Sequence, residues 1–255
     1  MLNQASVVAR KEIIDSLRDT RSLISSLMYA LMGPGVVFMV SLATRVDAVL
    51  IAMMSVFTLV SAFVGGMNVA MDTVAGERER QSLLPLLLNP VPRREILKGK
   101  WLAVSVFSLA GLIVNLLGFA ILFAVWGKLA PLVAVRALLA ITVGVLPLAL
   151  FAASVQVLIS TVCRAAKEAQ TYLSMLVFLP MGAGMFLVFF PKAAGAWCAW
   201  APVIGQQLQV EHWMQGAASS FIPSAALGCF TAALALLALE LASSRLHRDE
   251  IVYGS

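Results

Sequence analysis

The sequence predicts an all-α integral membrane protein with six membrane-spanning helices. Hydrophobic residues make up 61% of the chain and charged residues only 12%, about half the charged share of a soluble domain. Helices around a soluble core expose a polar face, and these stretches have none. Lipid offers no partner to backbone groups, so the spans must be helices. The stretches, each about long enough to cross a bilayer, are 23–43, 48–71, 101–126, 132–160, 172–190 and 222–242.

The placement of the basic residues predicts the topology. Most lysines and arginines lie in the segments that would share one side of the membrane with residues 2–21, whereas Arg45, Lys128, Arg136 and Lys192 fall on the other side. Because positive charge concentrates on the cytoplasmic side, both termini are expected in the cytoplasm. The net charge of +5 then reflects topology and contact with anionic lipid, and no nucleic-acid partner is expected.

Residues 2–21 precede the first span and are expected to form an interfacial helix. Apolar residues recur at near-helical spacing, with Ala5, Ile13 and Leu17 on one face and Lys11 and Arg18 on the other. Such a helix lies in the headgroup plane, although a cytoplasmic tail is the alternative. The first two spans, joined by 44–47, form an antiparallel hairpin, and the Gly-Pro-Gly run at 33–35 is expected to interrupt the first.

Polar residues within the later spans are few. Asn68, Asn115 and Gln156 are expected to bond neighbouring helices, with substrate contact as the alternative. Pro147 is the expected place for the fourth span to tilt or break, because proline frees a backbone carbonyl. Glu240 is expected to be paired or to reach the interface near the inner end of the last span.

Residues 191–221 form the longest outer segment. Its apolar stretches are too short to span, and Trp197, Trp200 and Trp213 suit a membrane interface. One or two short interfacial or re-entrant helices are therefore expected before the last span.

Several function classes lack the residues that they need. Ion-coupled carriers use buried carboxylates or histidines, and almost all ionisable residues here lie outside the spans. His212 and His247 fall on opposite sides, so no metal site is expected. The Gly99-Lys100 pair lacks the flanking residues of a phosphate-binding loop. The chain is therefore expected to be neither an enzyme nor a binder of metal or cofactor.

The richest polar segment is cytoplasmic and runs over 72–100, DTVAGERERQSLLPLLLNPVPRREILKGK. Its middle, 82–88, is apolar but too short to cross a bilayer. A short apolar helix between charged flanks suits docking of a soluble partner. The same pattern suits a helix that lies on the membrane, and the residues alone leave both open.

This segment resembles the permease subunits of type-2 ABC exporters. The similar parts are GERER at 76–80, the leucine-rich 83–88, PVPRREIL at 90–97 and Gly99-Lys100. The leader, with RKE at 10–12 and LRD at 17–19, and APVIGQ at 201–206 resemble the sodium-efflux (Nat-type) and drug-efflux branch. Gln81-Ser82 depart from a frequent Gly-Thr, Pro85 from a frequent acidic residue, and the large outer insert of many Nat-type relatives is missing.

The resemblance implies an exporter permease in the inner membrane. Two permease chains would pair, and two ATPase chains holding ATP and Mg²⁺ would dock beneath them. Tyr29 and Asn68 would line the path of a small hydrophobic or amphipathic molecule or an ion, and Trp197, Trp200 and Trp213 would gate it. The residues implied in ATPase coupling are Arg18, Glu77, Arg78, Glu79, Leu83, Leu87, Arg93, Arg94 and Glu95.

Two other functions remain as alternatives. In the first, the chain is the membrane anchor of an ABC-powered assembly or maturation machine, with a periplasmic partner. In the second, it is a stand-alone secondary carrier or channel. A neighbouring ATPase gene would favour an ABC system, and a co-encoded periplasmic protein would favour the anchor over the exporter.

Overall fold

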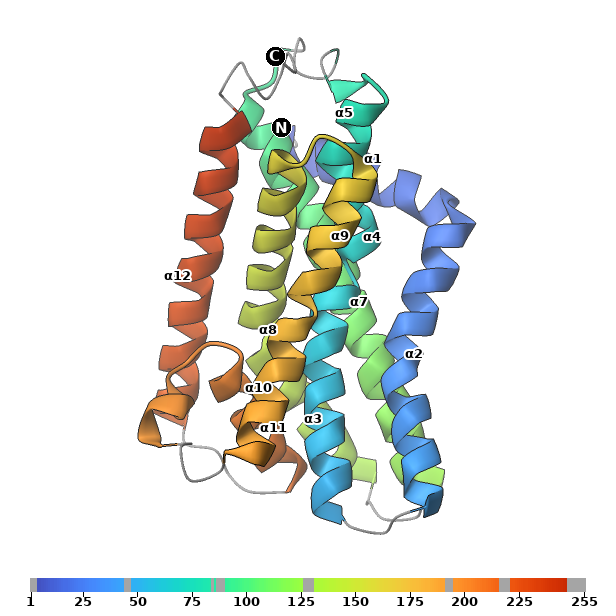
Figure 1. Ribbon diagram of the computed structural model, residues 1–255, viewed down its shortest axis with the longest axis vertical. Coiled ribbons are helices and arrows are strands. Elements are labelled where there is room, and N and C mark those ends of the chain that lie inside the picture. Colours follow the sequence, from blue (N-terminus) through green and yellow to red (C-terminus); the bar gives the residue numbers. More distant parts are fainter. Residues whose placement is uncertain are drawn as a thin grey trace.

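The computed structural model describes residues 4–43, 47–83, 85, 90–125, 131–190, 195–215 and 221–246. Within these ranges the regular structure is entirely helical, and six helices are long and apolar enough to cross a membrane. They run side by side as one bundle (Figure 1). This confirms the predicted fold class of a six-span helical membrane protein.

Some spans are single helices and others are built from several. The single ones are α2 (Thr20–Ala43), α7 (Arg93–Val125), α8 (Pro131–Val162) and α12 (Phe221–Leu246). The second span consists of α3 (Asp47–Val64), α4 (Met67–Met71), the π-helix η1 (Asp72–Gly76) and α5 (Glu77–Glu79). The fifth consists of α9 (Ala166–Leu176) and α10 (Phe178–Phe189).

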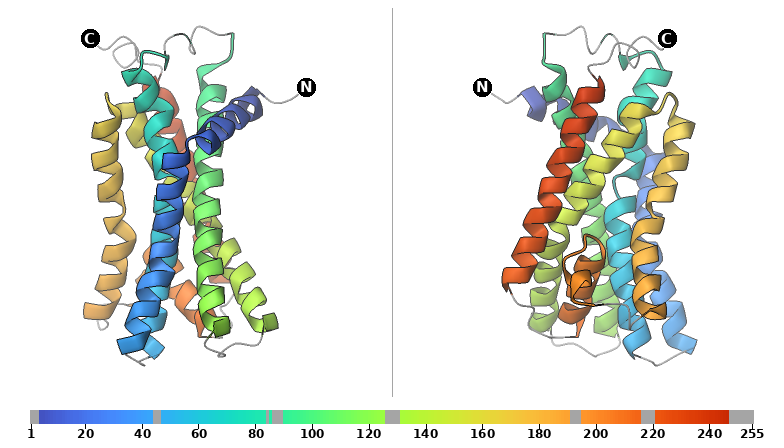
Figure 2. Two further views of the ribbon diagram at one scale, coloured as in Figure 1. Left: turned by 90° about the vertical axis from the view of Figure 1, so that its right-hand side faces the viewer. Right: turned by 60° about the vertical axis from the view of Figure 1, so that its left-hand side comes forward.

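The helices reach further into 72–100 than the apolar stretches indicate. The second span remains helical to Glu79 and α7 already begins at Arg93, so the described part of the segment is mostly helix, while most of the expected apolar helix at 83–88 lies outside the described residues. In the described part of the chain, three short helices complete the fold: α1 (Gln4–Arg18), η2 (Ala196–Ala199) and α11 (Ile204–Met214). The last two precede the final span and α1 lies across the bundle (Figure 2).

The two ends of the bundle differ in charge. The end with α1, α5 and the start of α7, here called the basic end, contains every lysine and arginine whose side chain the structure describes. The opposite end, here called the α11 end, contains η2 and α11.

The second span is the most buried of the six, and glycines let it approach α7 closely. A Cβ on Gly65 would lie 2.8 Å from the carbonyl oxygen of Phe107, and one on Gly66 would lie 2.7 Å from that of Val104. Both distances are too short for any side chain. The Gln156 amide of α8 donates to the carbonyl of Phe63 beside this glycine pair, as expected for a polar residue that bonds a neighbouring helix.

Two prolines do not break their helices. Helix α2 is continuous through Pro34, where an interruption was expected, and α8 is continuous through Pro147, where a tilt or a break was expected. At Pro34 the reason is visible, because the Asn115 amide of α7 donates to the carbonyl of Ala30 at 3.0 Å. That carbonyl lacks its usual helical partner because proline has no N–H.

A candidate coupling site at the basic end

Helix α1 packs against the start of α7 through small residues. A Cβ on Gly99 would lie 2.6 Å from the Cβ of Val8 and 2.7 Å from the Ala5 carbonyl oxygen, so glycine is required there. The buried positions of α1 are Ala5, Ala9 and Glu12. The residues of the expected apolar face differ in burial, since Ala5 is buried and Leu17 is 53% exposed, and the charged Glu12 is only 8% exposed.

Glu12 is buried because it shares an ion cluster with Lys100 and Glu77. Lys100 is 1% exposed, and its Nζ lies 3.1 Å from Glu12 Oε1 and 2.8 Å from Glu77 Oε2. Lys11 stands 3.9 Å from the other Glu77 oxygen. An ammonium group is buried only when it is paired, so this cluster fixes α1, α5 and α7 relative to one another.

Backbone groups of the π-helix η1 form hydrogen bonds with side chains of α7 and α8. Lys100 Nζ also donates to the Thr73 carbonyl at 2.6 Å, and the Ala75 N–H donates to Ser160 Oγ of α8 at 3.0 Å. Both backbone groups therefore have partners from outside their own helix. Single π-turns of this kind are frequent at functional sites.

Arg78 and Glu79, which follow Glu77 in α5, bind the connection between α8 and α9. Arg78 donates from Nη1 to the Cys163 carbonyl at 2.6 Å and from Nη2 to the Thr161 carbonyl at 2.9 Å. Glu79 accepts the Ala166 N–H at 2.8 Å. Arg78 thus satisfies free carbonyls at the end of one helix and Glu79 a free N–H at the start of the next.

The start of α7 makes a similar set of contacts with α12. Arg93 donates to the Leu246 carbonyl at 3.2 Å, which is the last residue of α12. Arg94 forms an exposed ion pair with Glu240, so the carboxylate that was expected to pair or reach the interface does pair. Glu95 pairs with Lys98 of its own helix at 2.9 Å.

Helix α5 ends in a turn that normally carries glycine. The Ser82 N–H donates to the Glu77 carbonyl at 2.9 Å and the Gln81 N–H to the Arg78 carbonyl at 3.0 Å. Gln81 has a φ of 57°, the left-handed conformation that usually belongs to glycine in this motif. The departure from Gly-Thr noted in the sequence therefore falls on the residue where glycine fits best.

The remaining coupling residues differ in accessibility. Leu83 is 3% exposed and packs in the core with Leu97 and Leu246, and Arg18 is exposed in the last turn of α1. Leu87 lies outside the described residues. Sequence reasoning missed Glu12, Lys100 and Thr73 as parts of the site. Glu12 and Lys100 did stand in the resembling motifs. A charged residue beside an apolar stretch, however, is usually exposed to solvent at the end of a span, so their burial was not expected.

The two residues predicted to line a path lie on different spans. The Asn68 amide of α4 donates to the Ser25 and Ser26 hydroxyls of α2 at 2.8 and 3.1 Å, so it bonds a neighbouring helix. Tyr29 follows Ser25 and Ser26 by about one turn of α2 and is 46% exposed.

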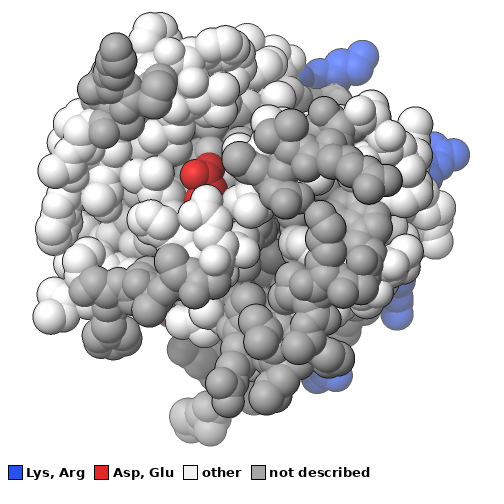
Figure 3. Space-filling model, turned by 90° about the horizontal axis from the view of Figure 1, so that it is seen from below, with Lys and Arg blue, Asp and Glu red and all other residues white. Residues whose placement is uncertain are grey.

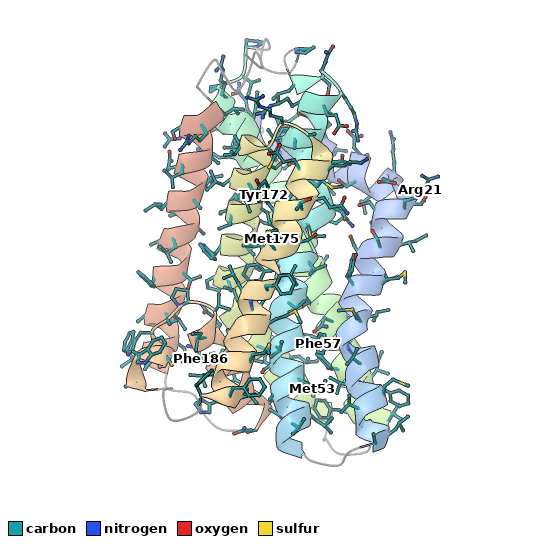
Figure 4. All side chains as sticks on the ribbon, viewed as in Figure 1. Arg21, Met53, Phe57, Tyr172, Met175 and Phe186 are labelled. Carbon is teal, nitrogen blue, oxygen red and sulfur yellow. The ribbon has the colours of Figure 1, made fainter. Side chains whose placement is uncertain are left out.

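Two apolar grooves of about 490 Å³ each lie along the fifth span. One runs between the end of α8 and α9 and includes Tyr172 and Met175. The other lies between α3 and α10 and includes Met53 and Phe57 (Figure 4). An apolar molecule would fit in either groove.

The three tryptophans at the α11 end do not form one group. Trp197 and Trp200 are 54% and 55% exposed, and the Trp197 ring lies 6.0 Å from that of Phe186. Trp213 instead packs into the bundle, where its ring occupies the space beside Gly144 of α8.

The APVIGQ motif forms the turn that starts α11. Val203, with a φ of 71°, donates its N–H to Gln206 Oε1 at 2.7 Å. The Gln206 amide nitrogen then donates to Thr231 Oγ1 of α12 at 2.7 Å. Gln206 therefore caps its own helix and ties it to the last span.

No three His, Cys, Asp or Glu side chains gather to hold a metal ion among the residues that the structure describes. The six long apolar helices define a multi-pass membrane protein.

Comparison with known proteins gives the family. Residues 6–239 match the family described as "ABC-2 family transporter protein", and the chain belongs to that family. It is 37% identical over 149 residues to the ABC transporter permease protein NatB of Bacillus subtilis, covering 54% of this chain and 37% of NatB.

Two further relatives are probable ABC transporter permease proteins NosY. The NosY of Pseudomonas aeruginosa is 34% identical over 113 residues, covering 42% of this chain and 41% of that protein. The NosY of Stutzerimonas stutzeri is 31% identical over 106 residues, covering 39% and 38%. The matches thus span about two fifths of the relatives' length, and they agree with the predicted Nat-type branch.

Proposed function

We propose that the chain is the permease subunit of an ATP-driven exporter and that its basic end receives a separate ATPase subunit. The observation that carries the proposal is the set of contacts made by Glu77, Arg78 and Glu79. Through them one short segment is joined to α1, to α7 and to the α8–α9 connection. A push on this segment would therefore move several spans together.

The contacts divide the coupling residues into two kinds. Glu77, Arg78 and Arg93 hold the bundle together, so their role is to pass movement on. Arg18 and Arg94 are exposed at the same end, which makes them the better candidates for direct contact with the ATPase. Substituting the first kind would loosen the permease. Substituting the second would mainly weaken the docking, because an exposed ion pair such as Arg94–Glu240 adds little stability.

The proposed orientation places the basic end in the cytoplasm. All described lysine and arginine side chains lie at that end, which agrees with the positive-inside rule. The α11 end then faces the outside of an inner membrane, and ATP with Mg²⁺ belongs to the partner.

The proposed cargo path involves the second and fifth spans. The groove between α3 and α10 is apolar over nearly its whole surface and suits a hydrophobic or amphipathic molecule. Helices α2 and α10 expose large apolar side chains such as Met28, Met39, Phe178 and Phe189, which suit contact with lipid or with a second permease chain. Asn68, which bonds α2 to α4, would hold one wall of the path.

Co-purification with the ATPase encoded beside this chain tests the proposal. Wild type, the double variant Arg18→Glu/Arg94→Glu and the control Arg245→Glu are compared in mild detergent. Arg245 is also exposed at the basic end, on α12. Capture by wild type and control, with loss in the double variant, is expected. No capture by a correctly inserted wild type would favour a stand-alone carrier, and equal capture by all three would refute the docking residues.

A further inference from the structure

Glu211 of α11 is an acidic residue without a basic partner among the described side chains. Its Oε1 accepts a hydrogen bond from Ser55 Oγ of α3 at 2.9 Å and one from Gln207 Nε2 at 3.4 Å. None of the ion pairs among the described residues includes it. Viewed from the α11 end, acidic atoms lie in a hollow bordered by uncharged and undescribed residues (Figure 3). A carboxylate in such surroundings favours a cation.

A second observation points to a ligand at the same place. Gln207 is 1% exposed, and its Oε1 has no hydrogen-bond partner among the described residues. Its Nε2 is directed at the Glu211 carboxylate, so the free oxygen belongs to an amide held beside that carboxylate. A buried amide oxygen without a donor is unfavourable, and a ligand N–H would remove that penalty.

The number and kind of atoms indicate the ligand. Glu211 Oε1 already accepts two hydrogen bonds, so the acceptors left for a ligand are the second carboxylate oxygen and Gln207 Oε1. A primary ammonium group brings a positive charge and N–H donors for both. Only one carboxylate is present here, whereas Ca²⁺ sites gather six to eight oxygen ligands, several of them from carboxylates. An apolar groove adjoins the site, because Gly184 lines the groove between α3 and α10 and the Gln207 amide nitrogen lies 3.1 Å from the position of a Cβ on Gly184. That groove would take the hydrocarbon part of an amine.

We propose that Glu211 and Gln207 bind the primary ammonium group of an amphipathic amine at the α11 end, with Ser55 orienting the carboxylate. The inference rests on the proposed export function and narrows its cargo to a chemical class. Binding here needs neither ATP nor the ATPase, so it can be measured on the permease alone.

The test uses dansylcadaverine, a fluorescent primary ammonium, and its N-acetyl derivative, which has the same body without the charge. The full chain is placed in lipid nanodiscs and energy transfer from its tryptophans to the dansyl group is titrated, with empty nanodiscs as background. Saturable binding of the ammonium probe, at least about tenfold tighter than that of the neutral probe, is expected.

Three variants locate the binding. Glu211→Gln removes the charge at nearly constant shape and is expected to weaken ammonium binding about tenfold or more, leaving the neutral probe unchanged. Gln207→Met removes the free acceptor and is expected to weaken ammonium binding severalfold. The control Asp15→Asn removes an exposed carboxylate at the basic end and should bind as wild type.

The contrary outcomes are distinct. Equal binding of both probes, unchanged binding by Glu211→Gln, or displacement of the probe by sodium but not by potassium would each overturn the ammonium site. Failure of ATPase capture with intact, Glu211-dependent binding would instead refute the export function and leave the site standing.

Discussion

Asn115 of α7 donates its side-chain amide to the backbone carbonyl of Ala30 in α2 at 3.0 Å. Pro34 leaves this carbonyl without its helical partner, because it has no N–H to donate. Gly118 makes the contact possible, since a Cβ there would lie 2.6 Å from the Pro34 ring. A polar side chain of one span thus supplies the hydrogen bond that the backbone of another span lacks.

Asn115→Leu is expected to destabilise the protein by about 1–3 kcal/mol, because the Ala30 carbonyl loses its donor in a buried site. Thermal unfolding in detergent measures the loss. The same substitution in a Pro34→Ala background should have a clearly smaller effect, since residue 34 then supplies the N–H. An equal effect in both backgrounds would show that Asn115 acts through packing alone.

Lys100→Met is expected to destabilise the structure by about 3–5 kcal/mol, because it removes the buried counter-charge of two buried carboxylates and leaves them only the exposed Lys11. Release of α1 from α7 should follow, and limited proteolysis within 4–18 reports it. The triple variant Glu12→Gln/Glu77→Gln/Lys100→Met removes all three charges and should recover much of the stability. A single variant as protease-resistant as wild type would contradict the role of the cluster.

Gln81→Gly is expected to stabilise the protein by about 1 kcal/mol, since glycine adopts the positive φ of this turn without steric strain. The melting temperature of the isolated permease measures the change. Ser82→Gly is the control. Ser82 is adjacent to Gln81, but it is not one of the described residues with a positive φ, which are Gln81 and Val203. A lower melting temperature for Gln81→Gly would mean that the glutamine side chain makes a stabilising contact.

Gln206→Leu is expected to destabilise α11 by about 1–3 kcal/mol, because the buried Val203 N–H and Thr231 hydroxyl lose partners. Hydrogen exchange of residues 204–214 should rise while that of α8 stays constant. Uniform exchange across both helices, equal to wild type, would remove Gln206 from its capping role.

Cys163 is expected to react slowly with maleimide at pH 7. Burial raises the pKa of its thiol, and the Glu168 carboxylate raises it further, so the thiolate that reacts is scarce below that pKa and grows as the pH rises through it. Mass spectrometry of a Cys198→Ala/Cys229→Ala variant, in the folded state and in denaturant, measures this. Fast labelling of the folded protein at pH 7 would contradict the burial of Cys163.

The six spans could be predicted from the sequence because apolar length alone identifies a crossing helix. The helix ends at 72–100 could not, because the charges of Glu77, Arg78 and Glu79 look like those of a loop until their partners are known. The continuity of α2 was equally hidden, since Asn115 lies far along the chain from the proline that it compensates.

Only part of the candidate site could be predicted from the sequence, for the same reason. The segment 72–100 stood out through its charges and its resemblance, and its contacts with α8, α9 and α12 required the fold. Glu211 was not predicted, because a single carboxylate in an outer segment is common. It becomes a candidate binding residue only through the unpaired amide oxygen of Gln207, four residues earlier.

The pairing of Glu12 with Lys100 joins positions 88 residues apart and has a consequence for biogenesis. During translation α1 emerges long before α7, so the Glu12 carboxylate lacks its buried partner Lys100 while the first two spans insert. Docking of the N-terminal helix is therefore a late event that must wait for the third span. Reporter fusions truncated before residue 100 would present α1 in a place that it does not occupy in the finished protein.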